Sequence, residues 1–299
     1  MNETLQAERD GRRLELVLPP ARGEGAPLAL AGVRQALAHA LQALPPETGF
    51  ALIRGAAPGG FAGPEMASGP QAREASVAPT ISDLCEMVAS APVPVAVLLE
   101  GPVSGQGAEF ALAASCRLAD PAAGFDLGAM ALGRLPGGGA SLRLPRLIGA
   151  QEALRLMLKP EAISAAEALA LGLYDQVFDD EAPEARLAAA RAAAAALNNA
   201  GRAAPGLRDA RGYLGAVAAA RTALGPAPLA AAEAAVDCVE AALLLPEGQA
   251  RAFAALREAE VAAAPEAAAL AHLLRAERRN ADLPPALAGF AAATPRRLG

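Results

Sequence analysis

Residues 93–113 read VPVAVLLEGPVSGQGAEFALA, and the fold of the chain can be predicted outward from this stretch. Residues 93–99 carry only aliphatic side chains, which is typical of a strand buried on both faces of a parallel sheet. Residues 101–107 are rich in glycine, which permits backbone angles that other residues avoid, so they predict a tight turn. Residues 108–116 are mostly apolar and predict a helix. The stretch is therefore expected to form a strand, a turn and a helix.

The same order of strand and helix precedes this stretch. Short apolar runs closed by proline or glycine predict two strands, and longer segments with apolar residues at helical spacing predict two helices. The expected strands are residues 14–18 and 50–55, and the expected helices are residues 28–44 and 81–90. Because strands and helices alternate, the sequence predicts an α/β fold with parallel strands.

The character of the chain changes beyond about residue 150, where helical patterns replace this alternation. From residue 201 onward, alanine, leucine, arginine and glutamate dominate, and prolines divide the segment into separate helices. We therefore expect two domains. The first is an α/β core at residues 1–200, and the second is a helical region at residues 201–299 that mediates oligomerisation and covers the site.

Composition and charge exclude several classes of protein. The chain has 299 residues, enough for one or two domains, and its hydrophobic fraction of 54% excludes a disordered protein. A net charge of −6 gives no general affinity for nucleic acid. Without tryptophan, and with 3% aromatic residues, the chain is unsuited to stacking single-stranded bases. No apolar run reaches the roughly 18 residues of a membrane span, so we expect no membrane partner.

The few cysteines and histidines indicate a protein of a reducing compartment without a metal site. Three widely spaced cysteines with no Cys-x-x-Cys pair predict neither a disulfide framework nor a zinc centre. His39 and His272 are the only histidines, and neither has a nearby cluster of cysteine or aspartate. The first 13 residues are polar and charged, unlike a signal peptide. We therefore expect a cytoplasmic protein.

Two glycine-rich turns are candidates for a binding site. Residues 59–63 and 104–109 each follow an apolar strand, and backbone N–H groups from two such turns can hold one carbonyl oxygen and stabilise negative charge on it. Either turn can equally be a connection that needs glycine for its shape. The second turn lacks the third glycine of a dinucleotide-binding loop.

Glu109 is the most informative single residue. It begins the apolar run 109–114, so its carboxyl group is expected to be half-buried, and loss of solvation raises a carboxyl pKa. The N-terminus of a helix opposes that rise because its dipole favours the anion. A glutamate with a raised pKa can act as a general acid or base near neutral pH. The alternative is an ordinary glutamate stabilised by the helix dipole.

The order and spacing of these motifs resemble the crotonase (enoyl-CoA hydratase/isomerase) family. The resemblance covers residues 50–180. It rests on four segments, which are GFAG at 60–63, PVAV…GPVSGQGAEFALA at 94–113, LGRLPGGG…LRLPRLIG at 132–149 and ISAAEA…LGL at 163–173. A weaker similarity at 270–284 resembles the hydratase module of multifunctional fatty-acid oxidation enzymes.

The resemblance implies a crotonase-like ββα spiral core with a helical C-terminal region, assembled as a homotrimer or hexamer. It implies an acyl-CoA substrate, with coenzyme A as part of the substrate and no separate cofactor. The N–H groups of Ala62 and Gln106 would form the oxyanion hole for the thioester carbonyl, and Glu109 would be the first catalytic glutamate. The expected contacts with the coenzyme A thioester are Gly63, Gly105, Gly107 and Arg22.

The chain departs from the family pattern at several positions. Ala129 occupies the position of the second catalytic glutamate, and alanine cannot transfer a proton. Asp126, three residues earlier, is a candidate substitute, but it can equally be a capping residue. Pro64 and Glu65 follow the first oxyanion turn where the family has Ala-Asp.

Three functional hypotheses follow from this pattern. The first is an enoyl-CoA hydratase that adds water to a 2-enoyl-CoA with the single retained glutamate, Glu109. The second is an acyl-CoA thioester hydrolase that uses the same pocket. The third is a catalytically degenerate subunit that binds acyl-CoA or a protein partner without chemistry.

Overall fold

A computed structural model of the protein shows a central six-stranded sheet. The order of its strands is β1-β2-β3-β4-β6-β8. The described residues are 4–20, 27–63, 77–159, 161–178, 182–197 and 204–281. The strands of this sheet are β1 (Gln6–Asp10), β2 (Arg13–Leu18), β3 (Phe50–Gly55), β4 (Val95–Leu99), β6 (Cys116–Ala119) and β8 (Gln176–Val177). Within this sheet, strands β2, β3, β4, β6 and β8 are parallel to one another. Strand β1 pairs antiparallel with β2 at the edge. The short strands β5 (Val103–Ser104) and β7 (Phe125–Asp126) form a second, parallel pair.

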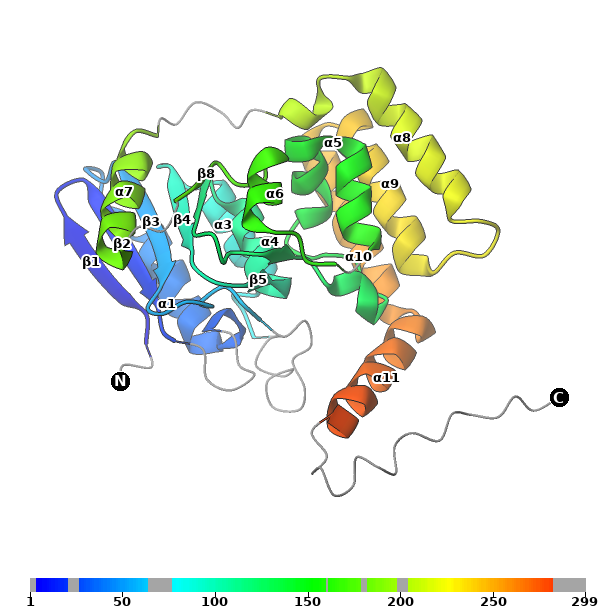
Figure 1. The fold of residues 1–299 in the computed structure, drawn as a ribbon, viewed down its shortest axis with the longest axis horizontal. Coiled ribbons are helices and arrows are strands. Elements are labelled where there is room, and N and C mark those ends of the chain that lie inside the picture. Colours follow the sequence, from blue (N-terminus) through cyan, green and yellow to red (C-terminus); the bar gives the residue numbers. More distant parts are fainter. Residues whose placement is uncertain are drawn as a thin grey trace.

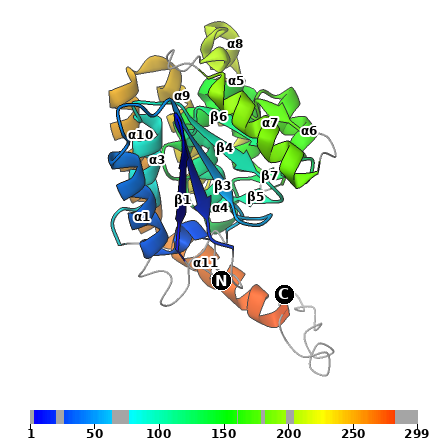
Figure 2. The same ribbon diagram turned by 90° about the vertical axis from the view of Figure 1, so that its left-hand side faces the viewer.

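Helices cover both faces of the sheet, as Figures 1 and 2 show. The helices of the first part are α1 (Ala31–Gln42), α3 (Ile81–Ala89), α4 (Gly105–Ala113), α5 (Ala140–Leu158), α6 (Ala165–Ala170) and α7 (Pro183–Ala195). Alternate residues of each strand point to opposite faces. Leu16 and Ile53 therefore pack with α1, α3 and α4, whereas Leu52 and Leu98 pack with α7 on the opposite face. The expected α/β class with parallel strands is confirmed.

The C-terminal part of the described chain is helical. It consists of α8 (Ala210–Ala223), α9 (Ala230–Leu244), α10 (Glu247–Ala263) and α11 (Pro265–Ala281). Figure 1 shows these helices at the end of the molecule away from β1, and α5 packs against both α8 and α9. The division into domains at residues 200 and 201 stays a prediction. Within the described residues, no helix is both long and apolar enough to cross a membrane.

The predicted helix at residues 108–116 is displaced. Helix α4 begins at Gly105, ends at Ala113, and is followed by the buried strand β6, which starts at Cys116. Ser104 is extended, and Gly105 has a φ of 52°, a left-handed angle that lets the chain turn sharply into the helix. Three of the four residues of β6 are apolar, like most residues of the helix, so the hydrophobic pattern alone does not separate the two elements.

A buried charge cluster on β2 predicts a pH-dependent contribution to stability. The Glu15 side chain is fully buried, and its oxygens lie 2.7 Å from Arg54 Nε and 2.7 Å from Arg191 Nη2. Burial alone would raise the pKa of Glu15, but hydrogen bonds and charge from both arginines outweigh burial and lower this pKa below 4.5. Ionised Glu15 therefore stabilises the fold above pH 4.5, and this contribution is lost as the pH falls below that value.

We expect Glu15→Gln to lower the free energy of unfolding by about 2 kcal/mol at neutral pH, because two guanidinium groups lose a charged acceptor. Urea unfolding at neutral and acidic pH measures this effect, and the difference from the wild type should shrink in acid. Glu47→Gln, at an exposed loop position, is the control and should change stability by less than about 0.5 kcal/mol. An equal loss at both pH values would contradict the ionised cluster.

Candidate active site

The two glycine-rich turns lie against each other. The Ser104 N–H donates to the Phe61 carbonyl at 3.1 Å, and the Gly63 N–H donates to the Ser104 hydroxyl oxygen at 3.1 Å. Gly107 makes this contact sterically possible, because a Cβ at residue 107 would lie 1.8 Å from the Phe61 oxygen. The structure thus brings together the segments that contain Gly63, Gly105 and Gly107, as expected from the sequence.

The two predicted oxyanion donors differ in their surroundings. Gln106 is in the first turn of α4, where amide groups have no carbonyl partner within the helix, and it lines a cavity. The Ala62 N–H instead donates to the Gly59 carbonyl at 2.9 Å, and Ala62 is not among the residues that line the cavity. The role of Ala62 as an oxyanion donor stays a prediction. For that role, the Ala62 N–H would have to leave the Gly59 carbonyl or donate to both oxygens at once. Arg22 lies outside the described residues.

The cavity beside Gln106 has a volume of about 130 Å³. Its wall is formed by α3, by the first turns of α4, by the segment 127–137 and by α10. Apolar groups such as Ile81 and Leu132 line it together with a few polar side chains, two of which are carboxylates, Glu109 and Glu258. Convergent polar groups beside apolar ones in one cavity mark a candidate small-molecule site.

Glu109 lies in the cavity wall with only 7% of its surface exposed. Its Oε1 atom accepts a hydrogen bond of 2.7 Å from the Gly137 N–H. Loss of solvation raises the pKa of Glu109, whereas the Gly137 hydrogen bond and the charge of Arg134 partly offset the rise. Glu109 is more deeply buried than the half-buried carboxyl expected from the sequence, and its pKa is raised in the expected direction because burial outweighs the groups that favour the anion.

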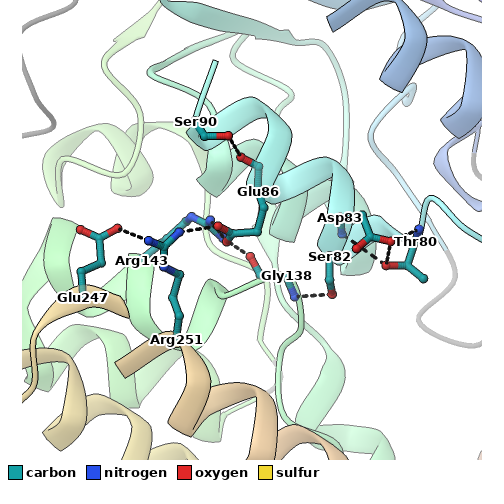
Figure 3. Close-up of polar contacts among 9 residues, drawn as sticks. All are labelled: Thr80, Ser82, Asp83, Glu86, Ser90, Gly138, Arg143, Glu247 and Arg251. Carbon is teal, nitrogen blue, oxygen red and sulfur yellow. Dashed lines mark hydrogen bonds and ion pairs between the residues drawn. The ribbon is translucent and has the colours of Figure 1, made fainter. Parts of the chain in front are cut away.

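The loop that donates to Glu109 makes polar contacts with two helices, and an ion-pair bridge links these helices to a third (Figure 3). The Gly138 N–H donates to Ser82 on α3, and the Gly138 carbonyl accepts from Arg143 on α5. Glu86 on α3 bridges Arg143 and Arg251, with a nitrogen of each arginine 2.5 Å from one of its oxygens. Because Arg251 is on α10, this network fixes the loop, the core and the C-terminal helix relative to one another.

Comparison with known proteins assigns a family to this arrangement. Residues 35–207, more than half of the chain, match the profile of the enoyl-CoA hydratase/isomerase family. The chain belongs to this family. A segment of 109 residues is 38% identical to the peroxisomal bifunctional enzyme of Danio rerio, covering 36% of this chain and only 15% of that protein.

Solved structures show the same crotonase fold. An enoyl-CoA hydratase from Mycobacterium avium subsp. paratuberculosis superposes with a TM-score of 0.60 over 90% of this chain and 97% of that one, at 24% identity. Pseudomonas aeruginosa DspI superposes with a TM-score of 0.55 at 28% identity over 65% of this chain and 81% of that one. The resemblance and the fold class inferred from the sequence are confirmed.

That Ala129 stands at the position of the family's second catalytic glutamate stays a prediction from the resemblance. Ala129, in the short 3-10 helix η2 (Ala129–Leu132), lines the cavity that contains Glu109. Asp126 does not line this cavity. Its Oδ1 atom accepts a hydrogen bond of 2.9 Å from the Gly128 N–H, which is the turn-capping arrangement. The geometry therefore favours the capping alternative for Asp126.

Glu258 is a carboxylate in the cavity wall that the sequence does not predict. It lies on the alanine-rich helix α10, which has two other glutamates, and nothing in the local sequence distinguishes it from a solvent-exposed residue. Its Oε1 atom is buried and has no hydrogen-bond partner among the described residues. Only the packing of α10 against the core brings this carboxyl group to the cavity.

Proposed function

We propose that the protein is an enzyme that adds water to a 2-enoyl-CoA. The observation that carries this proposal is the position of Glu109. This buried carboxyl group, with its raised pKa, shares a cavity with the first-turn amide of Gln106. A general base and an oxyanion donor in one cavity are two of the groups that conjugate addition to a thioester requires, and the α-carbon must also receive a proton.

The reaction follows from the positions of these groups. The thioester carbonyl oxygen would accept a hydrogen bond from the Gln106 N–H, which stabilises the negative charge that develops on this oxygen. Ionised Glu109 would accept a proton from water as the water oxygen bonds to the β-carbon of the acyl chain. The Gly137 N–H holds the Glu109 carboxylate in a fixed orientation for this transfer.

The test is incubation of the purified protein with trans-2-butenoyl-CoA. We expect the ultraviolet absorbance of the conjugated thioester to fall and mass spectrometry to detect a product heavier by one water molecule. Release of free coenzyme A with an unchanged acyl chain would instead favour the thioester hydrolase. Binding of the acyl-CoA without either product would favour the degenerate binding subunit.

We also propose that the protein assembles as a homotrimer or a hexamer and that it is located in the cytoplasm. The assembly is supported by the family resemblance, and light scattering during size-exclusion chromatography measures it. A reducing compartment is supported by the three cysteines, all of which are buried and free.

A further inference from the structure

Helix α10 positions Glu258 through contacts on the same face of the helix. Arg251 and Glu258 are seven residues apart, about two helical turns, so they lie on one side of α10 together with the buried residues Ala254 and Val261. Arg251 forms an ion pair with Glu86 on α3, as Figure 3 shows, and the apolar residues pack into a buried cluster. These contacts hold the helix against the core, and Glu258, on the same face, reaches the cavity.

Gly137 lies between the two carboxyl groups of the cavity. A Cβ built at residue 137 would lie 2.9 Å from Glu258 Oε1 and 3.2 Å from Glu109 Oε2. These two oxygens can therefore be no farther apart than the sum of these distances, about 6 Å. Because glycine has no side chain, the space between the two carboxyl groups stays open. The acyl chain of a thioester held at Gln106 would lie between the carboxyl group of Glu109 and that of Glu258.

The surroundings of the two carboxyl groups favour opposite protonation states. Glu109 accepts the Gly137 N–H, which favours its charged form, whereas Glu258 Oε1 is buried without a donor. Loss of solvation and the nearby charge of Glu109 raise the pKa of Glu258 to about 7, and Arg134 partly opposes them. Within the part of the chain that the structure describes, the charge of Glu258 also acts on the thiols of Cys85 on α3 and Cys238 on α9. The pair is best described as ionised Glu109 beside protonated Glu258.

We infer that Glu258, supplied by the C-terminal helix α10, is the second catalytic acid and base of this enzyme, in place of a glutamate at position 129. This inference rests on the proposed hydration. As the water oxygen bonds to the β-carbon, Glu109 takes a proton from water, and the electrons of the double bond move toward the α-carbon. Glu258 donates its proton to the α-carbon. Transfer of the proton from Glu109 to Glu258 through water restores the starting state.

The α-carbon step can be measured without hydration. In heavy water, ionised Glu258 would remove a proton from the α-carbon of butyryl-CoA, a saturated thioester, and return a deuteron. We expect wild-type protein to incorporate deuterium, measured by mass spectrometry, and Glu258→Gln to slow incorporation by about 10²–10⁴-fold. Glu260→Gln is the matched control, because Glu260 is exposed on the same helix and should leave the rate unchanged.

The two reactions should depend on pH in opposite directions. Hydration needs protonated Glu258, so its rate should fall as the pH rises through about 7, whereas deuterium exchange needs the ionised form and should rise over the same range. Glu258→Asp keeps the carboxyl group and should retain both pH dependences at a lower rate. This variant keeps the inference testable if Glu258→Gln does not fold, which circular dichroism would reveal.

The outcomes separate the inference from the proposed function. Hydration and exchange at wild-type rates in folded Glu258→Gln would overturn the role of Glu258 and leave the hydratase intact. Exchange that depends on Glu258 without hydration in the wild type would overturn the hydratase and keep the role of Glu258 at the α-carbon. A wild-type protein with neither activity would overturn both.

Discussion

Glu109→Gln is expected to lower the rate of hydration of trans-2-butenoyl-CoA by about 10²–10⁴-fold, because glutamine cannot accept a proton from water. The substitution preserves the shape of the side chain, and the amide oxygen can still accept the Gly137 N–H. The loss should therefore appear in kcat rather than in KM. Initial rates over a range of substrate concentrations measure both.

The same substitution should not destabilise the fold. The pKa of Glu109 is raised in the folded protein, so ionisation of this carboxyl group opposes folding, and the opposition grows as the pH rises above the ordinary value of 4.5. Glu109→Gln should match or exceed the wild type in thermal stability at neutral pH and gain nothing in acid. Glu260→Gln is the control for both measurements. Wild-type hydration by folded Glu109→Gln would contradict the assignment of Glu109 as the base.

Gly107→Ala is expected to have the largest effect on the fold around the site. A methyl group at residue 107 would lie 1.8 Å from the Phe61 carbonyl oxygen, so the two glycine-rich turns would have to separate. Overpacking against backbone in a buried region costs about 3 kcal/mol, and the displaced turns would also lose hydration activity. Urea unfolding measures the first effect, and the hydration assay measures the second.

Gly32→Ala is the matched control for this prediction. Gly32 is also in a helix, α1, but a Cβ there would meet no atom within 4 Å. Alanine is a better helix former than glycine, so we expect this variant to be more stable by about 0.5–1 kcal/mol and equally active. Equal stability of Gly107→Ala and the wild type would show that the two turns are not in contact.

Much of the fold could be predicted from the sequence because it is encoded locally. Continuous aliphatic runs become buried parallel strands such as β3 and β4, and glycine marks the turns that follow them. The edge strand β1 is different, since all five of its residues are exposed, four of them are polar, and they carry no apolar pattern. It exists because it pairs with β2 across a tight turn.

In the candidate site, too, some features could be predicted from the local sequence, whereas others depend on contacts between segments far apart in the chain. Glu109 could be identified from the sequence, because a carboxyl group within an apolar helix after a glycine-rich turn is a local signal that also resembles a known family. The hydrogen bond of the Ala62 N–H to Gly59 and the approach of Gly107 to Phe61 depend on the exact path of two loops.

By itself, the sequence determined the alternation of strands and helices, the family resemblance and the acidic residue at 109 within an apolar run. Only the tertiary structure decided that Glu258 enters the cavity and that Gly137 separates it from Glu109. The physical reason is that hydrophobic period and turn chemistry act between neighbours in the chain. The meeting of α4 with α10 depends instead on packing and ion pairs between segments far apart in the sequence.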